Sequence, residues 1–184
     1  WSSDVCSSDL AKHVFNVTAE YTPNPADGTL DITLSTIDNA PIHYTLDGTE
    51  PTAASPLYEG VLKIKENADF SAIAVRPTGN SRVISEKINF SKSSMKPIVA
   101  NQSVNKQYMF KGESTLVDGL KGNGNYKTGR WIAFYKNDMD MTIDLQQPTE
   151  ISSVAISTCV EKGDWVFDAR GFSVEVSDDG KNFT

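Results

Sequence analysis

Alternation of apolar and polar residues, repeated in short runs along the chain, is the feature that most constrains its fold. Residues two apart are apolar in five runs, at Leu30–Leu34, Ile42–Leu46, Phe70–Ala74, Met139–Leu145 and Phe172–Val176. A period of two places one face of an extended strand against a core and the other face in solvent. No window carries an apolar stripe at helical spacing over three turns, so we predict an all-β protein.

Turn signals separate these runs and suggest how the strands are organised. Four Asp-Gly pairs, at residues 27–28, 47–48, 118–119 and 179–180, supply the positive φ of tight turns. Short strands with such turns between them are typical of β-sandwiches and barrels. A polar stretch ending at Pro97 interrupts the pattern, because proline lacks the amide hydrogen that a ladder needs. We therefore predict a first unit at residues 11–91 and a second at residues 92–184.

Residues 1–10, which read WSSDVCSSDL, resemble one reading frame of a sequencing-library adapter and lack the layout of a signal peptide. We interpret them as an artefact, so that the true N-terminus is missing. The chain also stops just after the turn at residues 179–180, and we expect it to be a fragment at both ends. Without residues 1–10, Cys159 is the single cysteine, and its apolar neighbours predict a buried strand residue rather than a reactive thiol.

Charge and hydropathy exclude two classes of partner. The chain has 24 acidic and 17 basic residues, a net charge of −7, and its basic residues are scattered. Nucleic-acid surfaces are built from clustered lysine and arginine, so we predict no nucleic-acid binding. No apolar run approaches the roughly 20 residues that a spanning helix needs, so we also predict no membrane span.

Motifs for catalysis are missing from the sequence. The two histidines, His13 and His43, have no metal-ligand spacing around them, and no nucleophile elbow or phosphate-binding glycine pattern occurs. The glycine-rich stretch at residues 119–129 is interpreted as a surface loop. Asp138, Asp140 and Asp144 lie on one side of a predicted strand, which is the pattern of a solvated sheet face. We predict that this chain is not an enzyme and requires no cofactor.

Two aromatic segments remain as the candidate binding site. Sugars present apolar C–H faces edged by hydroxyl groups, so a sugar site combines an exposed ring with nearby hydrogen-bonding side chains. Only one of the consecutive Phe134 and Tyr135 can face inward on an extended segment. The alternative for Trp131 and Trp165 is that both fill the ends of a sandwich as core residues. The candidate carbohydrate-binding residues are Trp131, Phe134, Tyr135, Asn137, Trp165 and Arg170.

The first unit resembles a known family through one motif. The motif consists of Tyr44-Thr-Leu-Asp-Gly-Thr-Glu-Pro51, then Ser55-Pro-Leu-Tyr58, then a strand containing Ala72-Ile-Ala-Val75. In this it is similar to the chitobiase/β-hexosaminidase C-terminal domain over roughly residues 14–90. The resemblance implies an immunoglobulin-like β-sandwich of the kind attached behind glycosidase barrels.

The second unit resembles the discoidin family, also called factor 5/8 type C, whose bacterial members form family 32 of the carbohydrate-binding modules. Five pieces match in order: Leu116–Gly119, Gly129–Trp131, Met141–Leu145, Ile151–Val154 and Val174–Gly180 followed by Phe183. The resemblance implies a jelly-roll β-sandwich, here incomplete at its C-terminal end. It further implies a sugar site on loops at one end of the sandwich and a structural calcium held with the help of Asp118.

The order of the two modules resembles the C-terminal tails of Bacteroidetes family 20 β-N-acetylhexosaminidases. This resemblance implies a non-catalytic accessory fragment of a secreted enzyme, extracellular or periplasmic, whose catalytic domain lies upstream. Its implied partner is a glycan containing GlcNAc or galactose. Two alternatives stay open, namely a tail of another host such as an α-fucosidase or an adhesin, and a pair of purely structural spacer sandwiches without a sugar site.

Overall fold

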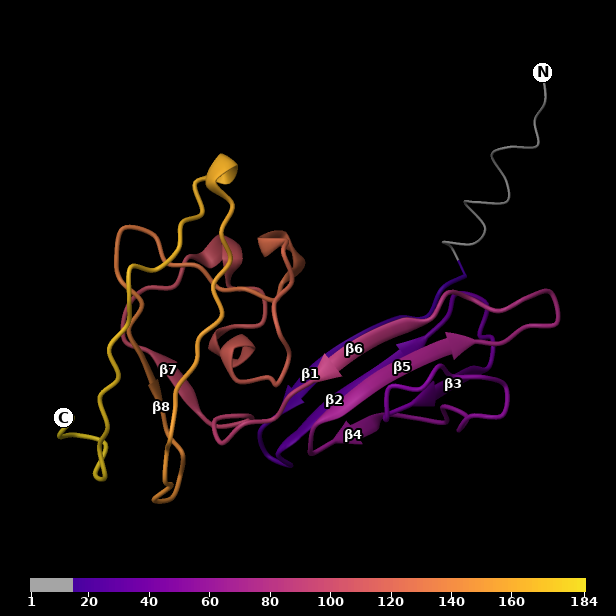
Figure 1. Cartoon of the computed structure of the whole chain (residues 1–184), viewed down its shortest axis with the longest axis horizontal. Helices are drawn as coiled ribbons and strands as arrows, with labels where there is room; N and C mark the ends of the chain where they lie inside the picture. The colour runs from indigo at the N-terminus through magenta and orange to yellow at the C-terminus, as the bar shows by residue number, and fades with distance from the viewer. Residues whose placement is uncertain (1–14) are drawn as a thin grey trace. The chain divides into compact units, whose positions relative to one another are not determined.

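The structure, a computed structural model, describes residues 15–184 and consists of β-strands, irregular segments and single turns of 3-10 helix (Figure 1). The prediction of an all-β fold is confirmed. Residues 1–14, which include the adapter-like segment and His13, lie outside the described residues. Contacts divide the chain into two compact units between Asn89 and Phe90, and each unit is described by itself.

The first unit contains two antiparallel sheets of three strands each. One sheet has the order β1-β2-β4, formed by β1 (Thr18–Asn24), β2 (Thr29–Ser35) and β4 (Leu62–Ile64). The other has the order β3-β5-β6, formed by β3 (Ile42–Thr45), β5 (Ala68–Ala74) and β6 (Ile84–Ile88). The Asp27-Gly28 pair joins β1 to β2 as the predicted hairpin turn, and Gly28 has a φ of 66°.

The core of the first unit lies between these two sheets. On β2 the apolar residues Leu30, Ile32 and Leu34 are at most 5% exposed, whereas Thr33 and Ser35 face solvent. Strand β5 is the central strand of its sheet, and it is buried continuously from Phe70 to Ala74. The rings of Tyr21 on β1 and Phe70 on β5 meet edge to face with centroids 6.4 Å apart. The two sheets therefore pack as a sandwich, as the alternation predicts.

The Asp-Gly turn inside the first motif ties the end of β3 to β5. Asp47 Oδ1 accepts hydrogen bonds from the Thr49 backbone amide at 3.1 Å and from the Thr49 hydroxyl at 2.6 Å. Gly48, with a φ of 80°, donates its amide hydrogen to the Asp69 carbonyl at 2.8 Å. A side chain at residue 48 would be strained at this φ and crowded by Asp69. These motif residues build the sandwich.

The second part of the motif pairs with the other edge of β3. The Tyr44 amide donates to the Pro56 carbonyl and the Tyr58 amide donates to the Ile42 carbonyl, at 3.1 and 2.8 Å. The Tyr58 hydroxyl accepts a hydrogen bond from the Leu34 amide at 3.0 Å. Residue His43 is half-buried, and its Nδ1 lies 2.7 Å from the Ser55 carbonyl oxygen. This histidine is therefore occupied in holding the segment.

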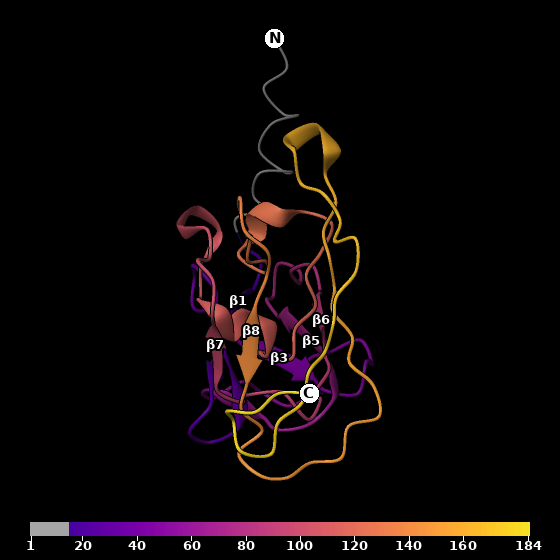
Figure 2. The same ribbon diagram turned by 90° about the vertical axis from the view of Figure 1, so that its left-hand side faces the viewer.

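The second unit has little regular structure. Strands β7 (Ile98–Ala100) and β8 (Met141–Ile143) pair antiparallel. Short 3-10 turns η1 (Lys106–Tyr108), η3 (Tyr126–Thr128) and η4 (Lys162–Asp164) lie at the same end of this unit in both views (Figures 1 and 2). Turn η2 (Glu113–Leu116) precedes the buried Val117, whose carbonyl accepts a hydrogen bond from the buried Met95 at 2.8 Å.

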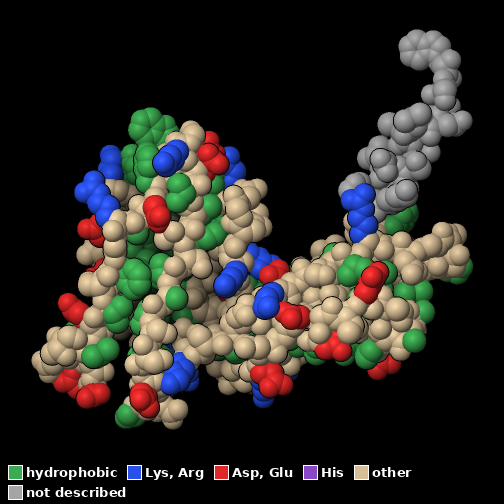
Figure 3. Space-filling view, in the orientation of Figure 1, with side chains coloured by type: hydrophobic (Ala, Val, Ile, Leu, Met, Phe, Trp, Pro, Cys, Tyr) green, Lys and Arg blue, Asp and Glu red, His purple; other side chains and the backbone are tan. Residues whose placement is uncertain are grey.

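Several strand predictions for the second unit are wrong. Residues 154–160 and 172–176 form no strand, and Cys159 is half-buried outside any strand instead of buried within one. Phe172, Val174 and Val176 are each at least 50% exposed, and hydrophobic side chains are open to solvent on this unit (Figure 3). An alternating sequence forms a strand only where a neighbour completes the ladder. Among the described residues, the only backbone hydrogen bonds made by residues 154–160 and 172–176 join Val176 to Thr184, on either side of the Asp179-Gly180 turn.

The run at residues 139–145 is a strand only at its centre. Met139 and Ile143, predicted to face the core, are about 40% exposed, and Met141 and Leu145 are half-buried. The three aspartates of this run face solvent as predicted. Asp140 accepts a hydrogen bond from the Asn101 side chain at 2.9 Å, and Asp144 accepts one from the Gln146 amide at 2.7 Å. Both carboxylates serve local structure.

Two isoleucines in the first unit test the location of the core. Ile32 is fully buried and Ile37 is 74% exposed, so Ile32→Ala should lower the free energy of unfolding by about 2–5 kcal/mol and Ile37→Ala by less than about 0.5 kcal/mol. Urea unfolding followed by circular dichroism measures both values. Equal losses from the two variants would contradict the core described above.

Candidate functional site

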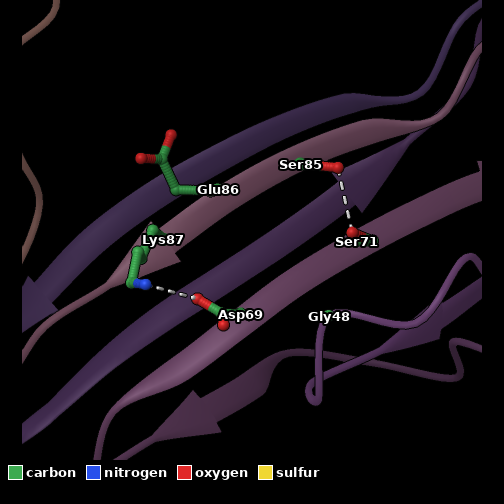
Figure 4. Close-up of a pocket in the computed structure, with 6 residues that line it drawn as sticks. All are labelled: Gly48, Asp69, Ser71, Ser85, Glu86 and Lys87. Carbon is green, nitrogen blue, oxygen red and sulfur yellow. Dashed lines mark hydrogen bonds and ion pairs between the residues drawn. The ribbon is translucent and has the colours of Figure 1, made fainter.

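One surface hollow lies on the sheet of β3, β5 and β6 (Figure 4). It measures about 360 Å³ and is lined by Gly48, Asp69, Ser71, Ser85, Glu86 and Lys87. The hydroxyls of Ser71 and Ser85 lie 2.9 Å apart across the two strands, and Lys87 Nζ lies 3.7 Å from Asp69 Oδ1. Ser71 is thus paired with Ser85 and Lys87 with Asp69, and no aromatic ring lines the hollow. We interpret it as the polar face of a sheet.

Another hollow, which we call the Trp131 pocket, lies in the second unit and measures about 340 Å³. The Trp131 ring is half-buried, and its Nε1 donates a hydrogen bond to the Asn123 carbonyl at 3.0 Å. A Cβ atom on Gly122 would lie 2.2 Å from this ring, so the glycine allows the loop to lie against the indole. The pocket is lined by Gly122, Asn123, Gly124, Trp131, Ser157, Thr158, Cys159 and Val160.

Residues 161–167 form a small hairpin that we call the η4 tip. Glu161 and Val166 close it by exchanging two backbone hydrogen bonds of 3.0 Å each. Trp165 adopts a left-handed conformation with φ of 62° and is 81% exposed, and Phe167 is 62% exposed. Their rings meet edge to face with centroids 6.2 Å apart. The alternative that Trp165 is a core residue is therefore wrong, and the tip displays a pair of free aromatic rings.

Asp164 anchors the η4 tip to the preceding loop. The Tyr126 hydroxyl donates a hydrogen bond to Asp164 Oδ2 at 2.5 Å, and Lys127 Nζ lies 3.1 Å from the same oxygen. Tyr126 in turn contacts the Tyr108 ring of η1 edge to face, with centroids 5.6 Å apart. Segments 122–128 and 157–167 therefore lie side by side at the end of the unit where η3 and η4 gather (Figure 2).

At neutral pH the ionised Asp164 carboxylate and the protonated Tyr126 and Lys127 side chains stay in contact. The hydrogen bond from Tyr126 and then the contact with Lys127 lower the pKa of the Asp164 carboxyl below its usual value. The bond to Asp164 raises the pKa of the Tyr126 hydroxyl and that of the Lys127 ammonium group. A hydrogen bond to an ionised carboxylate is shorter and stronger than a neutral one. The donors thus stay protonated while the acceptor stays ionised.

The other predicted site residues lie in different surroundings. Phe134 is half-buried and Tyr135 is 68% exposed, so the prediction that only one of them faces inward is confirmed. Lys136 Nζ lies 5.1 Å from the centre of the Tyr135 ring. The Asn137 side chain donates to the Ser103 carbonyl at 3.0 Å, which is a structural role. Arg170 is exposed and makes no hydrogen bond or ion pair within residues 15–184.

Trp131 lines a pocket with residues 122–124 and 157–160, and Trp165 lies five residues after Val160. Phe134, Tyr135, Asn137 and Arg170 do not line this pocket. Sequence reasoning missed Tyr126 and Lys127, because nothing in the glycine-rich loop signals a partner at Asp164. The Asp164 carboxylate, next to Trp165 in sequence, is bound to its own chain.

Asp118, the predicted calcium ligand, is 5% exposed. Its Oδ1 accepts a hydrogen bond from the Leu120 amide at 2.8 Å across the turn made by Gly119, whose φ is 79°. Over the described part of the chain, no three His, Cys, Asp or Glu side chains gather in one place. Calcium takes six to eight oxygen ligands, so an ion at Asp118 would draw most of them from main-chain carbonyls. The calcium site stays a prediction.

Comparison with known families agrees with the division into two units. Residues 32–88 match the family model described as Fn3 associated, and residues 97–184 match the one described as F5/8 type C domain. The chain thus carries an Fn3-associated domain followed by an F5/8 type C, or discoidin, domain, which confirms the resemblance of the second unit. No curated protein matches the chain. Among the described residues, no helix has the length and apolar character to cross a membrane.

Replacing Asp164 should release the η4 tip. Asp164→Ala removes the acceptor for Tyr126 and Lys127, so the ¹⁹F NMR line of fluorotryptophan at Trp165 should shift and sharpen. Asp168→Ala, which removes an exposed carboxylate without a hydrogen bond in residues 15–184, should leave that line unchanged.

The same signal should depend on pH. Because the pKa of Asp164 is lowered by folding, the anchor is fully formed above the ordinary value of 3.8 and is lost as pH falls through the lowered value. The Trp165 line should therefore move toward that of Asp164→Ala in acid. A wild-type line that is insensitive to acid, or identical lines for the two variants, would show that Asp164 does not hold the tip.

Calcium binding at Asp118 is tested by thermal unfolding. Asp118→Asn keeps an oxygen for the Leu120 amide but removes the charge, so calcium should raise the melting temperature of the wild-type chain and leave that of the variant unchanged. Measurements with calcium and with a chelator, followed by circular dichroism, give the difference. A wild-type chain that does not respond to calcium would overturn the expectation.

Proposed function

Because an F5/8 type C domain follows an Fn3-associated domain in this chain, we propose that the second unit is a non-catalytic glycan-binding module and the first its spacer. The observation that supports this most directly is the ring pair of Trp165 and Phe167, which stands free at the η4 tip. Exposed aromatic rings on a rigid hairpin are a typical recognition surface. Their anchoring by Asp164 gives them a defined position.

The chemistry of the η4 tip suits a sugar ring. The C–H face of a pyranose packs on an indole through apolar contact, and its hydroxyl groups extend beyond the ring edge. Lys127 lies beside the tip, and its ammonium group carries three donors, so donors remain for those hydroxyls beyond the contact with Asp164. Such a surface binds weakly and fits a range of glycans.

The proposed role is tethering. A weak binding module on the same chain as a catalytic domain raises the effective concentration of substrate without taking part in the reaction. We propose that the host is a secreted glycoside hydrolase, extracellular or periplasmic, and that it is a family 20 β-N-acetylhexosaminidase acting on glycans with GlcNAc or galactose. This host is supported by the motif at residues 44–58 and by the order of the two modules; an α-fucosidase or an adhesin is the alternative.

A purely structural role is the second candidate. It is favoured by Trp131 and Asn137, which are half-buried and donate hydrogen bonds to main-chain carbonyls of their own unit. In that case both units would act as spacers. The two roles differ in their dependence on Trp165, whose ring makes no hydrogen bond within residues 15–184 and which is 81% exposed.

Replacement of Trp165 separates these roles. Trp165→Ala should weaken binding to immobilised GlcNAc- and galactose-containing glycans by about tenfold, equivalent to about 1.4 kcal/mol, while the fold is unchanged by circular dichroism. Phe172→Ala is the matched control, since Phe172 is an exposed ring of the same unit outside residues 161–167 and outside the lining of the Trp131 pocket. Equal binding by wild type and Trp165→Ala, or equal losses in both variants, would favour the structural role.

A further inference from the structure

The Trp131 pocket and the η4 tip share two segments, 122–128 and 157–167, and Trp131 adds its ring to the pocket from outside them. In segment 122–128, residues 122–124 line the pocket, and Tyr126 and Lys127, which hold Asp164, follow after Asn125. In segment 157–167, residues 157–160 line the pocket, and the hairpin of the tip begins at the next residue. The two features are therefore neighbouring parts of one surface rather than separate sites.

The distance between them is limited by the chain itself. Val160 lines the pocket and Trp165 lies five residues later, so their Cα atoms are at most about 18 Å apart. The closure of the hairpin by Glu161 and Val166 shortens this span. One short chain of linked sugar units is therefore long enough to extend from the pocket to the ring pair.

The lining of the pocket indicates the class of molecule it takes. At about 340 Å³ the pocket is near the lower end of the range for small-molecule sites, which is about 300–1,000 Å³. Its lining includes the Trp131 ring and the side chains of Ser157 and Thr158, whose hydroxyls have no hydrogen-bond partner within residues 15–184. No lysine or arginine lines it, so it does not suit a phosphate group. A neutral ring rich in hydroxyl groups fits this set.

We propose that the Trp131 pocket and the η4 tip are two subsites of one site for an oligosaccharide, with one sugar unit in the pocket and another on the rings of Trp165 and Phe167. This inference rests on the proposed glycan-binding function and specifies its ligand as a chain of at least two units. Two weak contacts made by one ligand reinforce each other, because the first holds the second unit close to its subsite. Affinity therefore rises with the length of the glycan.

Two ligand series test the proposal on the whole chain. Isothermal titration with GlcNAc and its β-linked di- and trisaccharides, and with a matching galactose series, should give for one series at least a tenfold rise in affinity from mono- to trisaccharide. Trp165→Ala and Ser157→Ala should each reduce that rise. Phe172→Ala should leave it unchanged.

The reactivity of the Cys159 thiol gives a second measurement, independent of affinity. Cys159 lines the pocket and is half-buried, so a sugar unit bound there should slow its alkylation by iodoacetamide. Mass spectrometry of the peptide that contains Cys159 distinguishes it from Cys6. The trisaccharide of the binding series should slow the reaction severalfold, and Trp165→Ala should weaken this protection at the same ligand concentration.

The outcomes separate this inference from the function on which it rests. If a glycan binds and binding depends on Trp165, but trisaccharide and monosaccharide bind equally and Cys159 is not protected, the two-subsite proposal is overturned and the proposed function stands. If neither series binds, the glycan-binding function itself fails. A length-dependent affinity together with protection of Cys159 supports both.

Discussion

The hydrogen bond from Tyr126 to Asp164 joins two segments 38 residues apart, and the arrangement of the candidate site depends on it. The second unit has only the short pair of β7 and β8 as regular sheet within its described residues, so ladder hydrogen bonds do not position its loops. A carboxylate that accepts from a hydroxyl and an ammonium group does this instead. It places the free rings of the η4 tip next to the Trp131 pocket and so makes one binding surface from two loops.

The first unit is stabilised differently and was predicted well from its sequence. Leu30, Ile32 and Leu34 alternate with polar residues, and burial of this one face requires the strand that the structure contains. The same pattern at residues 172–176 predicted a strand that the structure lacks. Alternation states which face of a strand is apolar, but a ladder also needs a neighbouring strand. That neighbour depends on tertiary structure, which no local pattern contains.

The sequence indicated which types of residue form the candidate site, but not how these residues are arranged. Aromatic rings near polar side chains indicated Trp131 and Trp165, yet the exposure of each followed from features without a local signal. Trp131 is half-buried because Gly122 leaves room for its ring, and Trp165 is exposed because its left-handed backbone turns it to the hairpin tip. The partners of Asp164 were missed because they lie 38 and 37 residues before it in sequence.

The proposed glycan binding depends on the aromatic rings of this surface. Titrating the fluorotryptophan-labelled chain with GlcNAc and galactose oligosaccharides, while recording ¹⁹F spectra, tests it directly because each tryptophan gives its own line. The account predicts that the Trp165 line shifts progressively and saturates, and that the Trp131 line follows with the longer ligands. Lines that stay unchanged at saturating concentrations of both series would contradict it.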